Sequence, residues 1–155
     1  MKTRLKQCKL IVFDFDGVLT DNKVLVMEDG MEAVFCNRGD GLGFDMFRKS
    51  AVKTLILSTE TNKVVQARAN KLKVPVIFGE KDKREALKKY CEEQNIPLEE
   101  VCFVGNDIND MEAMKIVGLK LCPSDSHGKI KAFCDEVLPI AGGQGVARHI
   151  AELIC

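Results

Sequence analysis

The stretch Leu10-Ile11-Val12-Phe13-Asp14-Phe15-Asp16-Gly17-Val18 decides the fold of this sequence. It begins with a continuous apolar run of strand length and then presents two aspartates and a glycine. A strand that is apolar without alternation is typical of a parallel sheet whose two faces are both covered. Apolar runs of this kind recur along the chain, at residues 9–13, 52–58, 74–78, 101–104 and 118–122.

The segments between these strands carry apolar residues at helical spacing, as Ala86, Leu87, Tyr90 and Cys91 illustrate. We expect helices at residues 41–49, 62–72, 82–94, 108–117, 126–134 and 144–154. Strands that alternate with helices predict a doubly wound α/β fold with a mainly parallel sheet. Residues 20–36 differ, because Asp29-Gly30 between two short apolar runs predicts a projecting β-hairpin.

Length and composition narrow the class of protein. The chain has 155 residues, 46% of them hydrophobic, which suits one soluble globular domain over residues 1–155. Lysine plus arginine and aspartate plus glutamate number 23 each, and this balance argues against a nucleic-acid partner. No apolar stretch approaches the roughly 18 residues that span a bilayer, and the run before Asp14 is too short for a signal peptide. We therefore expect a cytoplasmic protein with no membrane partner.

The seven cysteines include no C-x-x-C pair. Four of them lie in apolar surroundings, where a reduced cysteine acts as a small hydrophobic residue. These four, which we expect to fill the core, are Cys8, Cys102, Cys122 and Cys134.

Polar residues follow the expected strands at their carboxyl ends, where open α/β sheets bind ligands. Asp14 and Asp16 follow the first strand, and two carboxylates so close together need a cation or a proton between them. Asp107 follows the fourth strand, so three carboxylates would meet in a hard-oxygen site suited to Mg²⁺. Taken alone, Asp16-Gly17 is equally compatible with a simple turn.

Two further strand ends carry groups that suit an anion. Ser58 and Thr59 precede the helix expected at residues 62–72, and free backbone N–H groups at a helix start bind phosphate. Lys83 lies in a first helical turn, where the helix dipole disfavours a cation unless an anion faces it. Both segments are also compatible with ordinary helix capping.

The order of these residues along the chain resembles the haloacid dehalogenase superfamily, and the resemblance covers the whole chain. Asp14-Phe15-Asp16-Gly17-Val18 looks like its first motif, Ser58 its second, Lys83 its third, and Gly105-Asn106-Asp107 with Asp110 its fourth. The resemblance implies phosphoryl transfer through an aspartyl-phosphate, with Asp14 as nucleophile and Asp16 as general acid and base.

The resemblance also implies a metal site and contacts to phosphate. Asp14, Asp107 and the Asp16 carbonyl would hold Mg²⁺, and Asp110 would steady the water shell of the metal. Ser58 and Lys83 would hold the oxygens of the transferring group.

The spacing of the motifs leaves no room for a cap domain over the site. Capless members of this kind resemble tetrameric phosphatases of sugar-acid phosphates, in which projecting hairpins build a central barrel and a C-terminal tail reaches the adjacent site. Asn37-Arg38-Gly39-Asp40-Gly41 and residues 141–148 match patterns of that group. We therefore expect a homotetramer, a flexible glycine-containing tail at residues 141–155, and substrate contacts from Asn37, Asp40 and Arg148.

Glu60 and Lys71 bear on the substrate. The octulosonate branch of that group usually has an arginine at the Glu60 position, whereas Glu60 with Lys71 resembles the branch acting on nonulosonate (sialic acid or KDN) 9-phosphates. Together with Thr59, they are our candidate sugar-binding residues. Three alternatives stay open: a 3-deoxy-octulosonate 8-phosphate phosphatase, a non-catalytic oligomerisation module that partners an acylneuraminate cytidylyltransferase, and a phosphoacceptor receiver domain.

Overall fold

The computed structural model describes residues 2–50 and 52–155 and contains one six-stranded sheet and one two-stranded hairpin. The strands of the sheet are all parallel and lie in the order β5-β4-β1-β6-β7-β8. Their bounds are β1 Leu10–Phe13, β4 Lys53–Leu57, β5 Val76–Ile77, β6 Val101–Val104, β7 Leu119–Cys122 and β8 Glu136–Val137. The doubly wound parallel sheet expected from the sequence is confirmed, and β8 is a strand that the sequence did not indicate.

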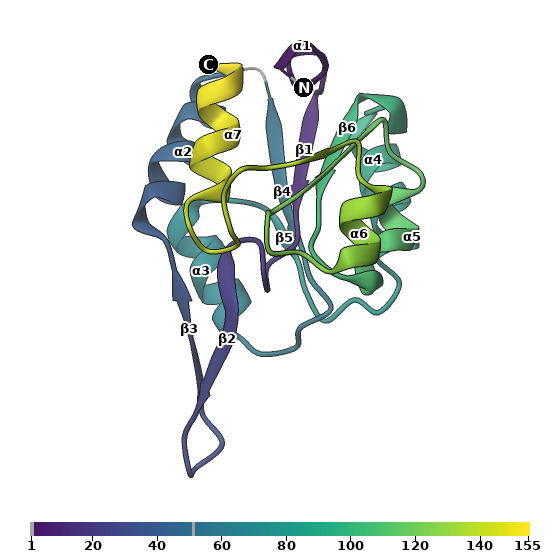
Figure 1. Cartoon of the computed structure of the whole chain (residues 1–155). Helices are drawn as coiled ribbons and strands as arrows, with labels where there is room; N and C mark the ends of the chain where they lie inside the picture. The colour runs from purple at the N-terminus through teal and green to yellow at the C-terminus, as the bar shows by residue number, and fades with distance from the viewer. Residues whose placement is uncertain (1, 51) are drawn as a thin grey trace.

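Strand β1 is the centre of the molecule. Ile11 and Phe13 pack on one side of the sheet, and Leu10 and Val12 pack on the other. The first side is covered by α2 (Arg38–Lys49), α3 (Val64–Leu72) and α7 (Val146–Ile154). The second is covered by α4 (Lys83–Gln94), α5 (Met111–Met114) and α6 (Gly128–Phe133) (Figure 1). The continuous apolar character of the strands follows, because each strand residue faces one of these two helical layers.

The helix expected at residues 108–117 is broken into a 3₁₀ turn at Ile108–Asp110 and the single-turn helix α5. A further short helix, α1 (Lys2–Leu5), was not expected; it buries Leu5 in the core. Within residues 2–50 and 52–155, no helix is both long and apolar enough to cross a bilayer.

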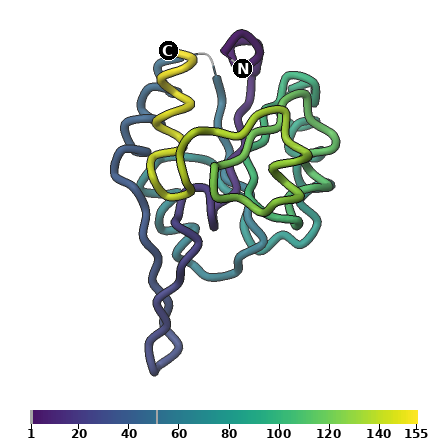
Figure 2. Tube along the Cα trace, viewed as in Figure 1, coloured from purple at the N-terminus to yellow at the C-terminus, as the bar shows by residue number. Residues whose placement is uncertain are grey.

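The hairpin expected at residues 20–36 is present as β2 (Thr20–Val26) and β3 (Glu32–Cys36). Gly30 adopts a positive φ of 83° at its tip, and the Met31 amide donates to the Asp29 carboxylate. The chain trace shows the hairpin extending well away from the body of the molecule (Figure 2). It leaves the sheet just beyond Asp14, so it stands beside the carboxyl ends of the strands.

The segment expected to be a flexible tail is instead packed against the body of the molecule. Helix α7 buries Val146, Ala147, Ile150 and Ala151 beside α2. The glycines before it lie against the turn that follows β1, because the Gly143 amide donates to the Val18 carbonyl. This close approach requires glycine, since a Cβ on Gly142 would lie 2.1 Å from the Gly17 carbonyl oxygen.

Candidate active site

The carboxyl ends of β1, β4 and β6 enclose a small polar cavity of about 120 Å³, which we name the catalytic-edge cavity. It brings together five of the residues that the sequence singled out. Its lining residues are Asp14, Asp16, Asn22, Ser58, Thr59, Asn106, Asp107 and Asn109. The cavity opens beside a second one of about 280 Å³, the outer cavity, which shares Asp16 and Asn22 and is lined also by Lys23, Val24, Glu32, Val34, Glu60, Asn62 and Val64.

A buried ion network lies directly behind the catalytic-edge cavity. The Lys83 ammonium donates to Asp14 at 2.7 Å and to Asp110 at 2.6 Å, and all three side chains are almost inaccessible to solvent. Burial alone would lower the pKa of Lys83, but the charges of Asp14 and Asp110 raise it above its ordinary value. Lys83 is therefore a permanent cation, which explains why a lysine is tolerated in the first turn of α4.

Asp14 shares the single ammonium of Lys83 with a second carboxylate, that of Asp110. Its Oδ1 accepts from the Phe15 amide at 2.8 Å and from Lys83. Burial, followed by the charge of Asp110, nevertheless raises the pKa of Asp14 to about 7. The catalytic-edge cavity thus lacks positive charge, and a cation in it would favour the carboxylate form of Asp14.

Asp16 is half-buried beside Asp14. Burial, followed by the charge of Glu60, raises the pKa of Asp16, while Lys83 and a hydrogen bond with Thr20 oppose the shift. A carboxyl group whose pKa is raised is better suited to give and take a proton.

The loop between β6 and α5 is organised by Asp110, which is fully buried. Its Oδ2 accepts from the Asn106 and Asp107 amides at 2.9 and 3.3 Å, and its Oδ1 accepts from Lys83. Both oxygens are therefore used by the protein, and the side chain does not line the catalytic-edge cavity. Asp110 thus positions Lys83 and the loop that presents Asp107, and its expected part in the water shell of the metal stays a prediction.

Ser58 and Glu60 share the turn after β4. The Ser58 hydroxyl accepts from the Glu60 amide at 3.1 Å, and the Glu60 carboxylate accepts from the Thr61 and Asn62 amides at 2.7 Å. Thr59 accepts from Asn109 across the cavity at 3.4 Å. The turn thus places Ser58 and Thr59 in the catalytic-edge cavity and Glu60 in the outer one.

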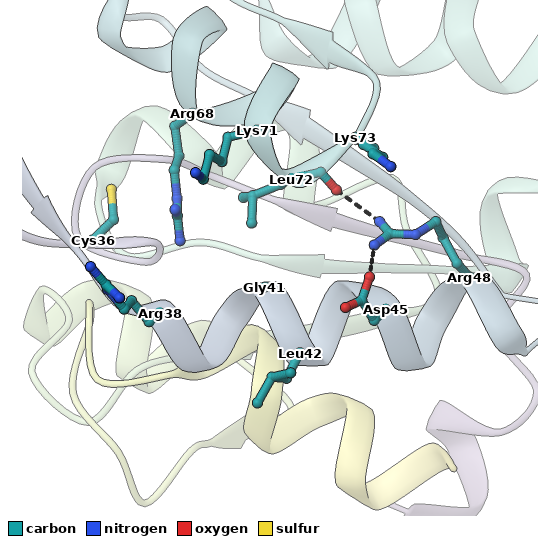
Figure 3. A pocket seen from close by; sticks show the side chains of 10 residues that line it. All are labelled: Cys36, Arg38, Gly41, Leu42, Asp45, Arg48, Arg68, Lys71, Leu72 and Lys73. Carbon is teal, nitrogen blue, oxygen red and sulfur yellow. Dashed lines mark hydrogen bonds and ion pairs between the residues drawn. The ribbon is translucent and has the colours of Figure 1, made fainter.

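Lys71 lies elsewhere. It faces a separate cavity of about 650 Å³ between α2 and α3, where Figure 3 shows it beside Arg68 and opposite Arg38. Within one chain, therefore, the expected pair of Glu60 and Lys71 lies in two different cavities.

Asn37, Asp40 and Arg148 serve the fold and do not reach the catalytic-edge cavity. Asn37 caps α2 by accepting from the Gly39 amide at 2.7 Å. Asp40 is buried and accepts from the Arg148 amide at 3.2 Å, so it caps the start of α7. The Arg148 guanidinium pairs with Glu152 on the same helix. Within one chain the polar atoms of these three residues hold helix ends, and their expected contacts to substrate stay a prediction.

The catalytic-edge cavity also contains asparagines that were not predicted. Asn106 is nearly buried, and its amide nitrogen would lie 1.8 Å from a Cβ on Gly17, which explains why that turn needs glycine. Asn22 adopts a left-handed φ of 62° at the hairpin base. Asn106 adjoins Asp107 in the fourth motif, so the motif was the available signal, whereas nothing in the sequence marked Asn22.

The residues present fit Mg²⁺, although not through three converging carboxylates. In the described ranges 2–50 and 52–155, no group of three or more acidic, histidine or cysteine side chains is placed to hold a metal. Asp14, Asp16 and Asp107 line the cavity together with neutral oxygen donors, and Asp14 and Asp107 are the two carboxylates expected to hold the metal. Such a set suits Mg²⁺, which usually takes one or two carboxylates and keeps several waters.

Comparisons with known proteins agree with this geometry. The profile of the haloacid dehalogenase-like hydrolases matches residues 48–150. The 3-deoxy-D-manno-octulosonate 8-phosphate phosphatase of Salmonella typhi is 30% identical over 153 residues, which cover 98% of this chain and 81% of the relative.

Two solved structures are close in shape. A haloacid dehalogenase family hydrolase from Streptomyces avermitilis is 45% identical with a TM-score of 0.93, covering 97% of this chain and 86% of that one. The 3-deoxy-D-manno-octulosonate 8-phosphate phosphatase of Moraxella catarrhalis, solved with magnesium, phosphate and KDO, is 27% identical with a TM-score of 0.93. That alignment covers 99% of this chain and 88% of the other.

A parallel sheet that presents two aspartates, a serine, a buried lysine and a further aspartate at one edge defines a Mg²⁺-dependent phosphomonoester hydrolase. The chain belongs to the haloacid dehalogenase-like hydrolase family. The described residues between β1 and β4 form the hairpin and α2 and contain no cap domain.

Proposed function

We propose that this enzyme hydrolyses a nonulosonate 9-phosphate, the phosphate ester of sialic acid or of its deaminated analogue KDN. The observation that carries the proposal is the place of Glu60 in the outer cavity, next to Asp16. A carboxylate there accepts hydrogen bonds from sugar hydroxyls at the point where the leaving group departs.

Asp14 attacks phosphorus in this proposal and forms an aspartyl-phosphate, while the ester oxygen leaves as an alcohol. Its Oδ1 is held by Phe15 and Lys83, which orients the carboxylate before reaction. Asp16 gives its proton to the leaving oxygen and then takes one from the water that hydrolyses the intermediate. The raised pKa of Asp16 supports the first of these roles.

Ser58 and Lys83 stabilise the phosphoryl oxygens during transfer, as donors fixed in place before the reaction. Mg²⁺ held by Asp14, Asp107 and the Asp16 carbonyl, when bound, supplies positive charge that lets a carboxylate approach a phosphate. Asn106 adds a further donor group to the same cavity.

Recognition of the acid group of the sugar requires a second subunit. The outer cavity contains Asp16, Glu32 and Glu60 beside Lys23, so its lining is acidic on balance, which suits hydroxyls and disfavours a carboxylate. Lys71 and Arg68 lie together in the cavity between α2 and α3. We infer that they reach the substrate of a neighbouring subunit in a tetramer.

The hairpin supports that assembly. Val24, Leu25, Val26, Met27, Met31 and Phe35 are all exposed large hydrophobic residues, and Phe35 is 73% exposed. Apolar side chains gathered on a projecting hairpin mark a protein interface. Sedimentation is expected to report a tetramer, and a monomer at all concentrations would contradict the shared site.

A 3-deoxy-octulosonate 8-phosphate is the second candidate substrate. The names of the Salmonella and Moraxella relatives favour it. The glutamate at position 60 is the feature that favours the nine-carbon ester instead.

The remaining alternatives lose support. A non-catalytic oligomerisation module does not need a lysine buried between two carboxylates. Taking charged groups out of water costs several kcal/mol per ion, and a module without catalytic activity gains nothing from it. A receiver domain carries its acceptor aspartate after a strand in the middle of the chain, whereas Asp14 follows the first strand of the sheet.

The test is Mg²⁺-dependent phosphate release from sialic acid 9-phosphate, KDN 9-phosphate and 3-deoxy-octulosonate 8-phosphate, with Asp14→Asn as the blank. We expect the highest kcat/KM for a nine-carbon ester and loss of turnover in Asp14→Asn. Glu60→Gln keeps the acceptor for the Thr61 and Asn62 amides, so it isolates the charge. It should lower kcat/KM for the nine-carbon esters alone. A preference for the eight-carbon ester would overturn the specificity and leave the mechanism in place.

A further inference from the structure

Asn22 has a backbone conformation that its place in the fold does not explain. Its φ of 62° lies in the left-handed region that favours glycine. The other described residues in this region, glycines aside, are Lys73 and Asn95, which cap the ends of α3 and α4, where the conformation is routine. Asn22 instead lies within β2, at the irregularity in pairing between Thr20 and Val24. Backbone strain of this kind is concentrated at functional sites.

Asn22 lies where the two cavities of the site meet. Asn22 and Asp16 are the residues that line both the catalytic-edge cavity and the outer cavity. The side-chain carbonyl carbon of Asn22 would lie 3.3 Å from a Cβ on Gly17, and the Asn106 amide nitrogen would lie 1.8 Å from the same point. The two amide groups are therefore neighbours at Gly17, next to the aspartate that is expected to protonate the leaving oxygen.

The side-chain amide of Asn22 is available to a ligand, in contrast to that of Asn62 in the same outer cavity. Asn62 donates to the Glu32 carboxylate at 3.1 Å and accepts from the Val64 backbone N–H at 3.0 Å, so both ends of its amide are used. Asn22 is held through its backbone N–H, which donates to the Thr20 hydroxyl at 3.2 Å. Its side chain is exposed, and across the described ranges 2–50 and 52–155 it makes no hydrogen bond that a ligand would have to displace.

An amide in this position suits a hydroxyl group. The amide donates through its nitrogen and accepts through its oxygen, and a hydroxyl likewise does both. The charged groups that line the outer cavity do only one of the two, because the ionised carboxylates of Glu32 and Glu60 accept and the Lys23 ammonium donates. Asn22 therefore supplies both a donor and an acceptor at the boundary of the two cavities.

We propose that Asn22 is a specificity-determining residue whose side-chain amide binds a hydroxyl on the carbon next to the phosphate ester. In this arrangement the phosphoryl group occupies the catalytic-edge cavity, the ester oxygen lies at Asp16, and the adjoining carbons of the leaving group enter the outer cavity. The contact is present before and during phosphoryl transfer, so it contributes to substrate binding and not to the chemical step. The inference rests on the proposed function, because it needs a hydroxylated leaving group, but it applies equally to an eight-carbon and a nine-carbon ester.

The test compares Asn22→Gly with the parent chain on two kinds of substrate. Glycine adopts the left-handed conformation freely and keeps the backbone N–H that donates to Thr20, so the variant removes only the side chain. With Mg²⁺ present, kcat and KM are measured for sialic acid 9-phosphate, KDN 9-phosphate and 3-deoxy-octulosonate 8-phosphate, and for para-nitrophenyl phosphate, which has no hydroxyl beside its ester. For the sugar ester that the parent hydrolyses best, kcat/KM relative to para-nitrophenyl phosphate should fall about fivefold, the effect of one neutral hydrogen bond. The loss should lie in KM rather than in kcat.

Asn95→Gly is the matched control, because it makes the same change at a φ of 53°, at the end of α4 and outside both cavities. It should keep the parent's ratio of kcat/KM values, and thermal unfolding followed by circular dichroism checks that both variants fold. An unchanged ratio in Asn22→Gly, a loss confined to kcat, or the same loss in Asn95→Gly would overturn the inference and leave the proposed function in place. If the parent hydrolyses para-nitrophenyl phosphate but none of the sugar esters, the proposed function fails and the inference fails with it.

Discussion

Lys83 contributes both to the stability of the fold and to the candidate active site. Its ammonium lies between the carboxylates of Asp14 and Asp110, with all three groups removed from water. Attraction inside the protein offsets the loss of hydration only while every partner is present. The same contacts orient Asp14, the proposed nucleophile, so we expect one side chain to support both stability and catalysis.

We predict that Lys83→Met destabilises the fold and abolishes turnover. Removing one partner of a buried ion pair typically lowers the free energy of unfolding by about 3–5 kcal/mol. Lys81→Met is the matched control, because Lys81 is exposed two positions earlier. Urea unfolding checks the stability, and equal midpoints for the two variants would contradict the role given to Lys83.

The buried carboxyl group of Asp40 should make the stability of the fold depend on pH. Burial raises its pKa from 3.8 to about 6, and its Oδ2 has no hydrogen-bond partner. A carboxyl whose pKa is higher in the folded state stabilises the fold below about pH 4, and this contribution is lost as the pH rises through 6. The loss amounts to about 3 kcal/mol at pH 8.

Asp40→Asn should therefore gain stability relative to the wild type as the pH increases. Asparagine keeps the oxygen that accepts from the Arg148 amide but carries no charge. Denaturation curves at pH 5 and pH 8 measure the difference, and a gap that narrows at pH 8 would show that Asp40 is not the cause.

At the scale of elements, α2 and α7 approach so closely that one position admits only glycine. A Cβ on Gly43 would lie 2.7 Å from the backbone of Arg148, whereas a Cβ on Gly41 would meet only Leu72 at 3.9 Å. Both glycines lie inside α2, where alanine is intrinsically favoured by about 1 kcal/mol.

We therefore predict that replacing glycine by alanine has opposite effects on stability at positions 41 and 43. Gly41→Ala should raise the thermal midpoint, and Gly43→Ala should lower it because α7 has to move away from α2. Differential scanning calorimetry measures both. A stabilising Gly43→Ala would show that the helices separate without cost.

The elements themselves were readable from the sequence. Strands β1 and β6 are uninterrupted apolar runs, and the hairpin turn carries Asp29-Gly30, so local patterns indicated these elements. The strand β8 was missed because Glu136–Val137 is too short to carry a pattern. A continuous helix was expected at residues 108–117. The observed helix is shorter, because Asp107 caps a 3₁₀ turn at its start.

Site residues that directly follow a strand could be predicted from the sequence. Those placed by contacts between distant segments could not. Asp14, Asp16, Ser58 and Asp107 meet because parallel strands end at one edge. The capping of α7 by Asp40 joins segments more than a hundred residues apart, and no spacing indicates it.

At the scale of the whole molecule, we expect one charged residue on the exposed apolar hairpin to dissociate the proposed tetramer. Phe35→Glu should convert the proposed tetramer to smaller species, because a buried carboxylate without a partner is strongly disfavoured. Val137→Glu, on the short strand β8 at the edge of the sheet, introduces the same charge elsewhere. Sedimentation velocity compares them, and a tetrameric Phe35→Glu would place the interface away from the hairpin.

The central position of β1 has a consequence for protein synthesis. Leu10 pairs with Lys53 on one side and with Val101 on the other, so the first strand of the sheet to be made has to wait for both of its neighbours. At translation rates of about 5–20 residues per second, its apolar backbone edge stays open on the ribosome for on the order of 10 s. During that interval the nascent chain exposes an unpaired strand, and unpaired strands favour aggregation.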